Sequence, residues 1–197
     1  MVPLHTVAYV PETYGSVWNV ARRSRDDWTA VAMTSLAEGG VPAVAIEPIA
    51  ARAGATKGSV YHHFANRDAL LQATVERWER EHTEAVIELV EAEETPLGRL
   101  RVLFGTVLDR SRKGSIELAL HNAADDPVVA PVLKRVSERR IEYLTELFAG
   151  LGFPPDVAHR RAVLAYSVYL GQVQMMATLP ELVEPLLDEV VQVLTRD

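Results

Sequence analysis

Residues 49–64 read IAARAGATKGSVYHHF and residues 66–71 read NRDALL, and these two stretches decide the fold of the N-terminal part of the chain. Gly54 separates two short helical patterns, which predicts a helix, a tight turn and a second helix too short to be stable alone. The pair must therefore be held by a shared apolar side, which comprises Ile49, Ala50, Ala53, Val60 and Phe64. Ala50 and Ala53 are small enough for the two helices to cross closely.

The other side of the second helix is polar, basic and aromatic, through Thr56, Lys57, Ser59, Tyr61, His62 and His63. Lysine can reach a phosphate or the edge of a guanine, and the hydroxyl groups can reach the DNA backbone. Gly58 permits a close approach to the floor of the major groove. Arg67 lies near the start of the next helix, where peptide N–H groups also favour phosphate. This surface is therefore predicted to lie against duplex DNA.

Helical periodicity dominates the rest of the chain and no strand alternation is convincing, so we expect an all-α fold. Ser24 and Asp27 have the spacing of a capping box, and the helix behind them is expected to end at Gly39–Gly40. Further helices are expected over 46–53, 56–64, 66 to about 93, from 96 onward, 116–124, from the turn at 125–127 to 151, 158–176, and up to about 194. Pro185 predicts a kink or a late start in the last one. The long helix from Asn66 is expected to bury one face, formed by Leu71, Val75, Trp78, His82, Ala85 and Leu89.

The segment from Trp28 to Leu71 resembles the head of the tetracycline-repressor (TetR) family. The resemblance is carried by Ala-Gly-x-Thr-Lys-Gly-Ser-x-Tyr-x-His-Phe, which begins at Ala53, and by Asn-Arg-x-x-Leu-Leu, which begins at Asn66. It implies an N-terminal three-helix helix-turn-helix DNA-binding domain, joined by a long helix to a C-terminal helical ligand-binding and dimerisation domain. The implied boundaries are 1–23 for a leader or arm, 24–66 for the DNA-binding domain and 67–197 for the effector-binding and dimerisation domain.

The resemblance also implies a cytoplasmic homodimer on a pseudo-palindromic double-stranded operator, with a recognition helix over about 56–63 in the major groove. Carried over residue by residue, base-edge contacts fall on Lys57, Gly58 and His62. Phosphate contacts fall on Thr56, Ser59, Tyr61, His63 and Arg67.

Two positions depart from the family pattern without touching the recognition surface. Ala45 stands where a Thr or Ser cap is common, and a missing cap costs roughly 1 kcal/mol. Pro48 stands where an ordinary helix former is usual, although its fixed φ suits a first helical turn. Upstream, Arg22, Arg23 and Arg25 fit either an arm that reaches the minor groove or a solvated basic helix end.

The distribution of charge agrees with a protein that touches phosphate at one end. Residues 1–67 hold six Lys and Arg residues against five acids, and residues 68–197 hold 14 against 22, which gives net charges of +1 and −8. The chain contains no cysteine, which excludes disulfides and thiolate chemistry and is compatible with a reducing cytoplasm. No secretory signal or uninterrupted apolar stretch of about 18 residues is present, so a soluble protein without a membrane partner is expected.

The C-terminal part is expected to bind a small-molecule effector in an apolar cavity. The candidate lining residues are Trp78, Phe104, His121, Arg140, Tyr143 and Tyr166. The alternative for most of the aromatic side chains is the plain core or the dimer interface, and for His121 a surface or hydrogen-bonded core position. Arg140 continues the apolar stripe of Leu133 and Val136, so its guanidinium should be partly buried and needs a partner. An internal carboxylate is the favoured partner, and an anionic effector is the alternative.

The last two helices are predicted to form the homodimer interface. The final helix carries Leu182, Val183, Leu186, Leu187, Val190, Val191 and Leu194. These residues cover more than half its circumference, which is too wide for one contact face and favours a four-helix interface with a second subunit. A core helix inside a monomer is the alternative.

Nothing in the sequence indicates an enzyme, a cofactor or a metal. The adjacent His62 and His63 point about 100° apart on a helix and lack an acidic partner one turn on, so a metal site there is not expected. The sequence therefore predicts a ligand-responsive DNA-binding transcriptional regulator, more specifically a repressor. The alternative is a helical small-molecule-binding or catalytic protein with a non-functional DNA-binding head.

Overall fold

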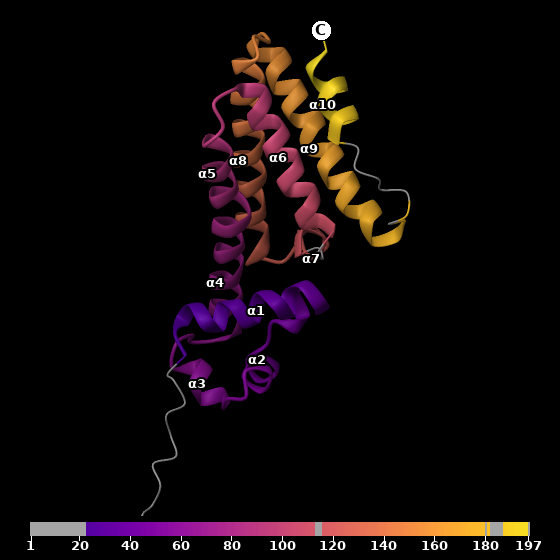
Figure 1. Cartoon of the computed structure of the whole chain (residues 1–197). Coiled ribbons are helices and arrows are strands. Elements are labelled where there is room, and N and C mark those ends of the chain that lie inside the picture. Colours follow the sequence, from indigo (N-terminus) through magenta and orange to yellow (C-terminus); the bar gives the residue numbers. More distant parts are fainter. Residues whose placement is uncertain (1–22, 113–115, 180, 182–186, 197) are drawn as a thin grey trace, which may run out of the picture.

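The computed structural model describes residues 23–112, 116–179, 181 and 187–196, and every regular element among them is a helix, as expected. A small head lies at one end of a body of longer, roughly parallel helices (Figure 1). The head and the helix leading out of it comprise α1 (Arg25–Gly39), η1 (Val41–Ala43), α2 (Ile46–Arg52), α3 (Lys57–Tyr61) and α4 (Arg67–Glu79). The body comprises η2 (Arg80–Glu84), α5 (Ala85–Glu91), α6 (Pro96–Arg112), α7 (Ile116–His121), α8 (Val129–Gly150), α9 (Pro155–Thr178) and α10 (Leu187–Thr195).

The start of each head helix follows from its capping residue. Ser24 and Asp27 form the predicted capping box, in which the Asp27 carboxylate accepts from the Ser24 N–H at 2.7 Å. Thr56 Oγ1 accepts from the Ser59 N–H at 3.3 Å at the start of α3, and Asn66 Oδ1 accepts from the Ala69 N–H at 2.8 Å at the start of α4. At α2 the residue before the helix, Ala45, supplies no side-chain cap.

The core of the head extends into the base of the body. Trp28, Ile49, Val60 and Phe64 belong to one buried apolar cluster, as predicted for the last three. The same cluster includes Trp78 of α4 and apolar residues of α7 and α8, namely Ile116, Leu120, Val129, Val132, Leu133 and Val136. A second cluster fills the body between α5, α6, α8, α9 and α10. The domain boundary between residues 66 and 67 stays a prediction, with one core spanning both sides of it.

The long helix from Asn66 contains an irregularity that the sequence analysis did not predict. Residues 80–84, η2, are π-helical, so one extra residue is inserted between α4 and α5. Before it, Leu71, Val75 and Trp78 are buried as predicted. Within it Thr83 is buried, and after it the buried positions are Val86 and Val90, whereas Ala85 and Leu89 are exposed. The single predicted face is therefore wrong beyond Trp78, because the inserted residue rotates the following helix by about one position.

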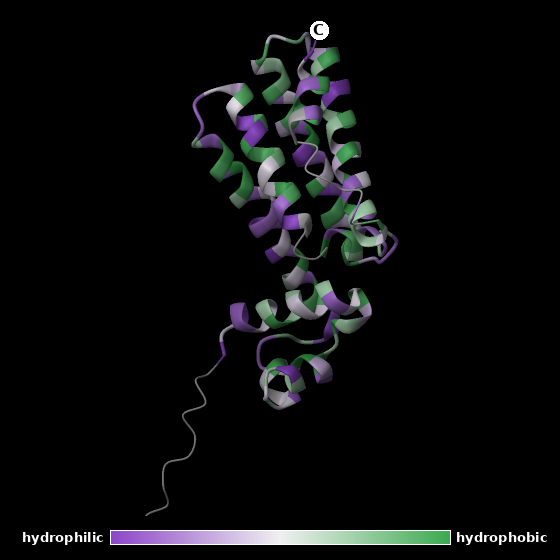
Figure 2. Ribbon diagram, turned by 45° about the vertical axis from the view of Figure 1, so that its right-hand side comes forward, coloured by the Kyte–Doolittle hydropathy of each residue, from purple (hydrophilic) through white to green (hydrophobic). Residues whose placement is uncertain are grey.

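The other predicted helices are confirmed with small shifts in their ends. The predicted segment 116–124 is helical only to His121, and the predicted 158–176 helix extends over Pro155–Thr178. Val190, Val191 and Leu194 lie on α10, whereas Leu182, Val183, Pro185 and Leu186 lie outside the described residues. Apolar and polar residues alternate along the turns of the body helices (Figure 2), as expected for helices that bury one face. None of the helices in the described ranges is both long and apolar enough to cross a membrane.

A buried ion pair lies where the body joins the head. Arg140 of α8 donates to Glu117 of α7 at 2.5 Å, and these side chains are only 13% and 5% exposed. The Arg140 Nε also donates to Thr83 Oγ1 at 3.0 Å, and its Nη2 donates to the His82 carbonyl at 3.2 Å. The predicted internal carboxylate partner of Arg140 is therefore confirmed. The pair connects η2, α7 and α8.

Burial alone would raise the pKa of Glu117, but the charge of Arg140, its hydrogen bonds and the nearby His121 outweigh it and lower the pKa from 4.5 to about 2. A carboxyl group whose pKa is depressed by folding stabilises the folded state above its unfolded pKa. That contribution is lost as the pH falls from about 4.5 towards 2. The shift corresponds to roughly 3 kcal/mol at neutral pH.

We therefore expect Glu117→Gln to lower the free energy of unfolding by roughly 3 kcal/mol at pH 7, because Arg140 is left buried without its counter-charge. At pH 3 the difference from the wild type should shrink by about half, since the carboxyl of the unfolded chain is then mostly protonated and folding has to ionise it. Urea unfolding at both pH values measures this. Glu138→Gln, which removes the exposed partner of Lys134, serves as the control and should change little at either pH. A loss for Glu117→Gln that does not depend on pH would contradict this electrostatic account.

Candidate nucleic-acid interface and effector cavity

The polar side of α3 is exposed at the end of the head far from the body (Figure 1). Val60 and Phe64 hold α3 to the rest of the head and are 0% and 1% exposed. The Tyr61 side chain, by contrast, is 52% exposed although it is large and aromatic. The exposed group also includes Thr56, Lys57, Gly58, Ser59 and His62, with His63 half-buried beside them. The structure thus brings the sequence-predicted residues of α3 together on one surface.

The contacts of this surface are weak and easily replaced. The Lys57 ammonium lies 3.2 Å from the Glu47 carboxylate, and both side chains are well exposed, at 65% and 74%. An exposed ion pair contributes little stability, so Lys57 can exchange Glu47 for a phosphate or a base at small cost. The hydroxyl groups of Thr56 and Ser59 are 3.1 Å apart and remain at the surface.

Two glycines in this segment, Gly54 and Gly58, differ in whether the backbone conformation requires a glycine. Gly54, in the turn between α2 and α3, has a φ of +62°, a conformation that favours glycine. Gly58 has no such φ, and a Cβ placed there would meet only Thr56 Oγ1 at an ordinary 3.7 Å. Glycine is a poor helix former, so its presence at position 58 has no explanation within the chain itself. A close approach by another molecule would explain it.

Arg67 differs from the other predicted contacts because its guanidinium is engaged inside the head. Its Nε donates to the Val44 carbonyl and its Nη2 to the Val41 carbonyl, both at 3.0 Å. These bonds connect the start of α4 to the η1–α2 connection. Arg25, upstream, lies over the Phe64 ring at 4.6 Å from the ring centroid and donates to the His63 carbonyl at 3.4 Å. It therefore lies at the end of the α3 surface, whereas Arg22 lies outside the described residues.

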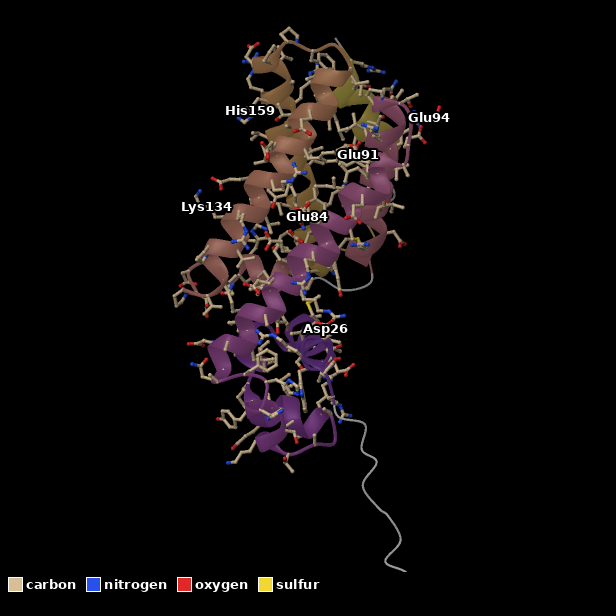
Figure 3. The ribbon with its side chains drawn as sticks, turned by 90° about the vertical axis from the view of Figure 1, so that its left-hand side faces the viewer. Asp26, Glu84, Glu91, Glu94, Lys134 and His159 are labelled. Atoms are coloured by element: carbon tan, nitrogen blue, oxygen red, sulfur yellow. The ribbon has the colours of Figure 1, made fainter. Side chains whose placement is uncertain are left out.

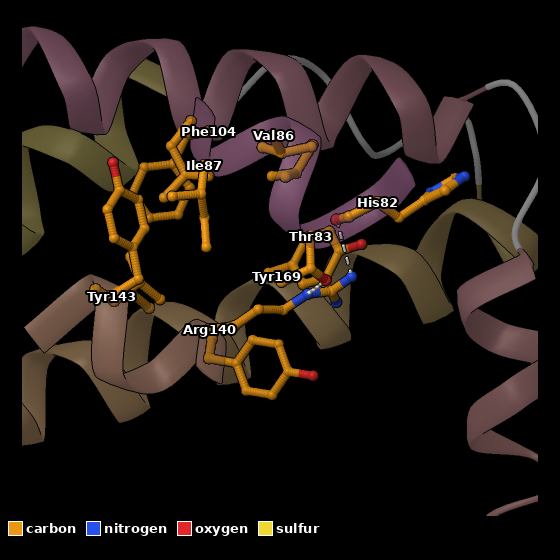
Figure 4. Close-up of a pocket in the computed structure, with 13 residues that line it drawn as sticks. His82, Thr83, Val86, Ile87, Phe104, Arg140, Tyr143 and Tyr169 are labelled. Atoms are coloured by element: carbon orange, nitrogen blue, oxygen red, sulfur yellow. Dashed lines mark hydrogen bonds between the residues drawn. The ribbon is translucent and has the colours of Figure 1, made fainter. Parts of the chain in front are cut away.

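A cavity of about 50 Å³ lies in the body between η2, α5, α6, α8 and α9. Of the predicted effector residues, Phe104, Arg140, Tyr143 and Tyr166 line it. The other residues of the lining are His82, Thr83, Val86, Ile87, Leu103, Val107, Leu144, Ala165 and Tyr169. Figure 4 shows the Arg140 guanidinium turned towards Thr83 and His82, with Ile87, Phe104 and Tyr143 at the other end.

Trp78 and His121 do not belong to this lining but support it from behind. The Arg140 guanidinium lies over the Trp78 ring at 5.2 Å from its centroid. His121 lies 3.7 Å from the Glu117 carboxylate. The sequence analysis did not name Thr83 or Glu117, and it placed His82 on the buried face of the long helix but not in the cavity. Glu117 carried a signal, since it is the only acid in the mainly apolar segment 116–124.

The hydroxyl groups around the cavity already have partners. The Tyr143 hydroxyl donates to Glu91 at 2.7 Å, and burial with this bond raises the pKa of Tyr143. The Tyr166 hydroxyl lies 3.0 Å from Ser137 Oγ, and burial raises its pKa as well. Burial, followed by the charge of nearby Glu117, also raises the pKa of Tyr169. All three phenols are therefore neutral near pH 7.

The outer side of α9 and α10 carries exposed apolar side chains. Val163, Leu164, Met175 and Leu179 lie on or directly after α9, and Val193 lies on α10. Each is between 41% and 53% exposed. The acidic character predicted for the body appears elsewhere, where Glu84, Glu91 and Glu94 follow one another along the body away from the head (Figure 3). Among the residues that the structure describes, no cluster of His, Asp or Glu side chains could hold a metal ion.

Comparisons with known proteins agree with this geometry. Residues 29–74, which span most of α1 through most of α4, match the family described as bacterial regulatory proteins, tetR family. Two uncharacterized HTH-type transcriptional regulators from Mycobacterium tuberculosis, strains CDC 1551 and H37Rv, are each 30% identical over 152 residues, which is 69% of this chain and 75% of theirs.

Solved structures share the fold over most of both chains. A TetR-family transcriptional regulator from Streptomyces coelicolor has a TM-score of 0.75 at 23% identity and covers 89% of each chain. A transcriptional regulator from Rhodococcus sp. Rha1 has a TM-score of 0.74 at 23% identity, covering 88% of this chain and 94% of its own. The reduced form of NemR from E. coli has a TM-score of 0.73 at 18% identity and covers 86% and 94%. From the sequence match in the head and the relatives that extend it over the body, the chain belongs to the tetR family of bacterial regulatory proteins, a family of DNA-binding, helix-turn-helix transcriptional regulators.

Proposed function

We propose that this protein is a ligand-responsive repressor that binds a pseudo-palindromic operator as a homodimer. The observation that carries the proposal is the α3 surface, where exposed polar and aromatic residues surround a glycine that nothing inside the chain requires. Lys57, Gly58 and His62 contact base edges in the major groove. Thr56, Ser59, Tyr61 and His63 contact phosphates, which position the head. Arg67 contributes mainly by holding the start of α4 in place, given its bonds to Val41 and Val44.

The second subunit binds across α9 and α10. Exposed apolar residues that gather on two neighbouring helices of one protomer favour burial against a partner. A twofold axis there joins the two C-terminal regions and leaves both heads free. The two copies of α3 can then enter successive major grooves, about 34–36 Å apart along one face of the duplex.

The effector binds in the cavity of the body and acts on the head through η2. The cavity includes His82 and Thr83, which belong to the same continuous helical path as α4. Arg140 contacts both of these residues and also lines the cavity. A ligand that pushes apart the walls of this cavity therefore moves the helical path that carries α4. The distance between the two copies of α3 then leaves the value that one turn of DNA requires, and the operator is released.

Binding to a DNA fragment from upstream of its own gene, titrated with salt, tests the DNA-binding part of the proposal. We expect the logarithm of affinity to fall linearly with the logarithm of salt concentration, because phosphate contacts release counterions. Lys57→Ala and Tyr61→Ala should each lose roughly 1–3 kcal/mol of binding free energy. Thermal unfolding of both variants should remain near that of the wild type, since both side chains are exposed.

Glu138→Ala, on the body, is the control and should bind DNA as the wild type does. If neither Lys57→Ala nor Tyr61→Ala changed affinity, α3 would not dock as proposed. Absence of binding at any salt concentration would favour the alternative of a protein whose head does not function on DNA.

Gly58→Ala separates a structural requirement from a binding requirement. The added methyl group meets no close atom within the chain, and alanine is the better helix former, so the stability should stay the same or rise by up to about 1 kcal/mol. Affinity for the operator fragment should fall, because the methyl group lies between α3 and the groove. Gly54→Ala should show the opposite pattern. Its stability should fall, because the φ of +62° disfavours alanine, whereas the folded protein should keep its affinity for the operator fragment. Unchanged DNA affinity in Gly58→Ala would remove the close approach from the proposal.

Leu164→Glu tests the dimer interface. Leu164 is 52% exposed in the protomer, so the change should leave the protomer fold intact while placing a charge in the proposed interface. Light scattering after size-exclusion chromatography should report a dimer for the wild type and a monomer, or a strongly weakened dimer, for the variant. Leu89→Glu is a matched control because Leu89 is also 52% exposed but lies on α5. Equal dimerisation of Leu164→Glu and Leu89→Glu would exclude this interface.

A further inference from the structure

We propose that the ligand of the body cavity is a compact, uncharged and mainly apolar molecule. This inference rests on the proposed role of the cavity as the effector site and names the chemical class of the effector. The alternatives are an anion that pairs with Arg140 and a cation that pairs with Glu117. The contacts around these two residues decide between the three classes.

Both buried charges at the cavity are already compensated. Arg140 and Glu117 share two hydrogen bonds, of 2.5 Å and 3.4 Å. An anionic ligand that took Arg140 would leave the Glu117 carboxylate buried and unpaired, and a cationic ligand that took Glu117 would leave Arg140 in the same state. Removing one member of a buried ion pair is strongly unfavourable. A charged ligand would therefore have to offset this cost as well as its own desolvation.

The guanidinium of Arg140 is also enclosed on its faces and edges. The central carbon of the guanidinium lies 5.2 Å from the centroid of the Trp78 ring and 5.9 Å from the centroid of the Tyr169 ring. Its edges reach Thr83, the His82 carbonyl and Glu117. Figure 4 shows this polar end of the cavity, with the bonds to Thr83 and His82 drawn as dashed lines. A ligand in the cavity therefore meets the aliphatic stem of Arg140 more readily than its charge.

The remaining polar groups offer no charge to a ligand. Burial, followed by the charge of Arg110, lowers the pKa of His82, so its imidazole is neutral near pH 7. The hydroxyl groups of Tyr143 and Tyr166 bind Glu91 and Ser137. The rest of the wall is carbon, contributed by Val86, Ile87, Leu103, Phe104, Val107, Leu144 and Ala165. An apolar ligand breaks no ion pair by entering such a site and gains the burial of its surface.

The size of the cavity limits the ligand. Its volume of about 50 Å³ is well below the roughly 150 Å³ of an apolar protein cavity that accepts benzene. A ligand therefore has to push side chains aside. Ile87 of α5 and Leu103 and Val107 of α6 are the half-buried members of the aliphatic wall, whereas Val86 and Ala165 are fully buried. These half-buried side chains between α5 and α6 can move aside at the smallest cost. The space that they open is small, so only a compact molecule fits in the cavity.

Three probes with one carbon skeleton test the inference on the full chain, namely toluene, benzoate and benzylammonium. Toluene should raise the midpoint of thermal unfolding by a few degrees, because a ligand that binds only the folded state stabilises it. The two ions should need roughly tenfold higher concentration or more for an equal shift, because each has to break the buried pair. Ile87→Trp, which fills the yielding wall, should lose the response to toluene.

Leu89→Trp is the matched control, since Leu89 lies on the same helix but outside the cavity lining, and it should keep the response. If Ile87→Trp does not fold, Ile87→Ala takes its place, and its wider cavity should respond to toluene at least as strongly as the wild type. A shift with benzoate or benzylammonium equal to that with toluene would overturn the inference. So would a toluene response that survives in folded Ile87→Trp, or its absence from both the wild type and Ile87→Ala. No DNA is present in these measurements, so a failure of operator binding is a separate result.

Discussion

The ion pair between Arg140 and Glu117 is the constraint on which the arrangement of the body depends. Two charges cannot be taken out of water unless each finds the other in good geometry, with the remaining hydrogen-bonding groups satisfied. Burial would lower the pKa of Arg140, but Glu117 outweighs it and raises the pKa above its ordinary value. Because the partners come from α8 and α7 and the additional acceptors from η2, the pair ties the placement of these three elements to one another. The pair therefore selects a register that apolar packing alone would leave less well defined.

The π-helical segment of the long helix depends on Arg140 of this ion pair. An inserted residue disturbs the regular hydrogen bonding of a helix and needs a compensating interaction. Arg140 supplies one, by donating to the carbonyl of His82 and to the hydroxyl of Thr83 within the segment. The insertion turns Thr83, Val86 and Val90 inward in place of Ala85 and Leu89. The cavity lining on α5 is thus a consequence of an irregularity that Arg140 stabilises.

The sequence predicted most of what is local and least of what depends on partners distant in the chain. The caps at Ser24, Thr56 and Asn66, and the buried side of α2 and α3, follow from residues within a few positions of one another. The burial of Arg140 and its need for a carboxylate also followed from one helical stripe. The identity of that carboxylate did not, because Glu117 reaches Arg140 from another helix, 23 positions away. Nor could the face of α5 be predicted, since no proline or glycine marks the insertion at 80–84. The positions of Trp78 and His121 also depend on partners distant in the chain. Both were expected in the cavity lining, and both lie behind the residues that form it.

The shared core limits how the head can respond to the body. Residues of α1 to α4 pack in one cluster with Ile116 and Leu120 of α7 and with the first turns of α8. Separating them would expose side chains that are nearly fully buried, at a cost of about 25 cal/mol for each Å² of apolar surface. Tilting the head alone is therefore expensive, whereas moving it together with α7 and the start of α8 keeps this cluster closed. The cavity lies on the other side of η2, within the second cluster. On the proposed mechanism, a ligand bound there acts on the head at the boundary between the two clusters, where Arg140 and Thr83 meet.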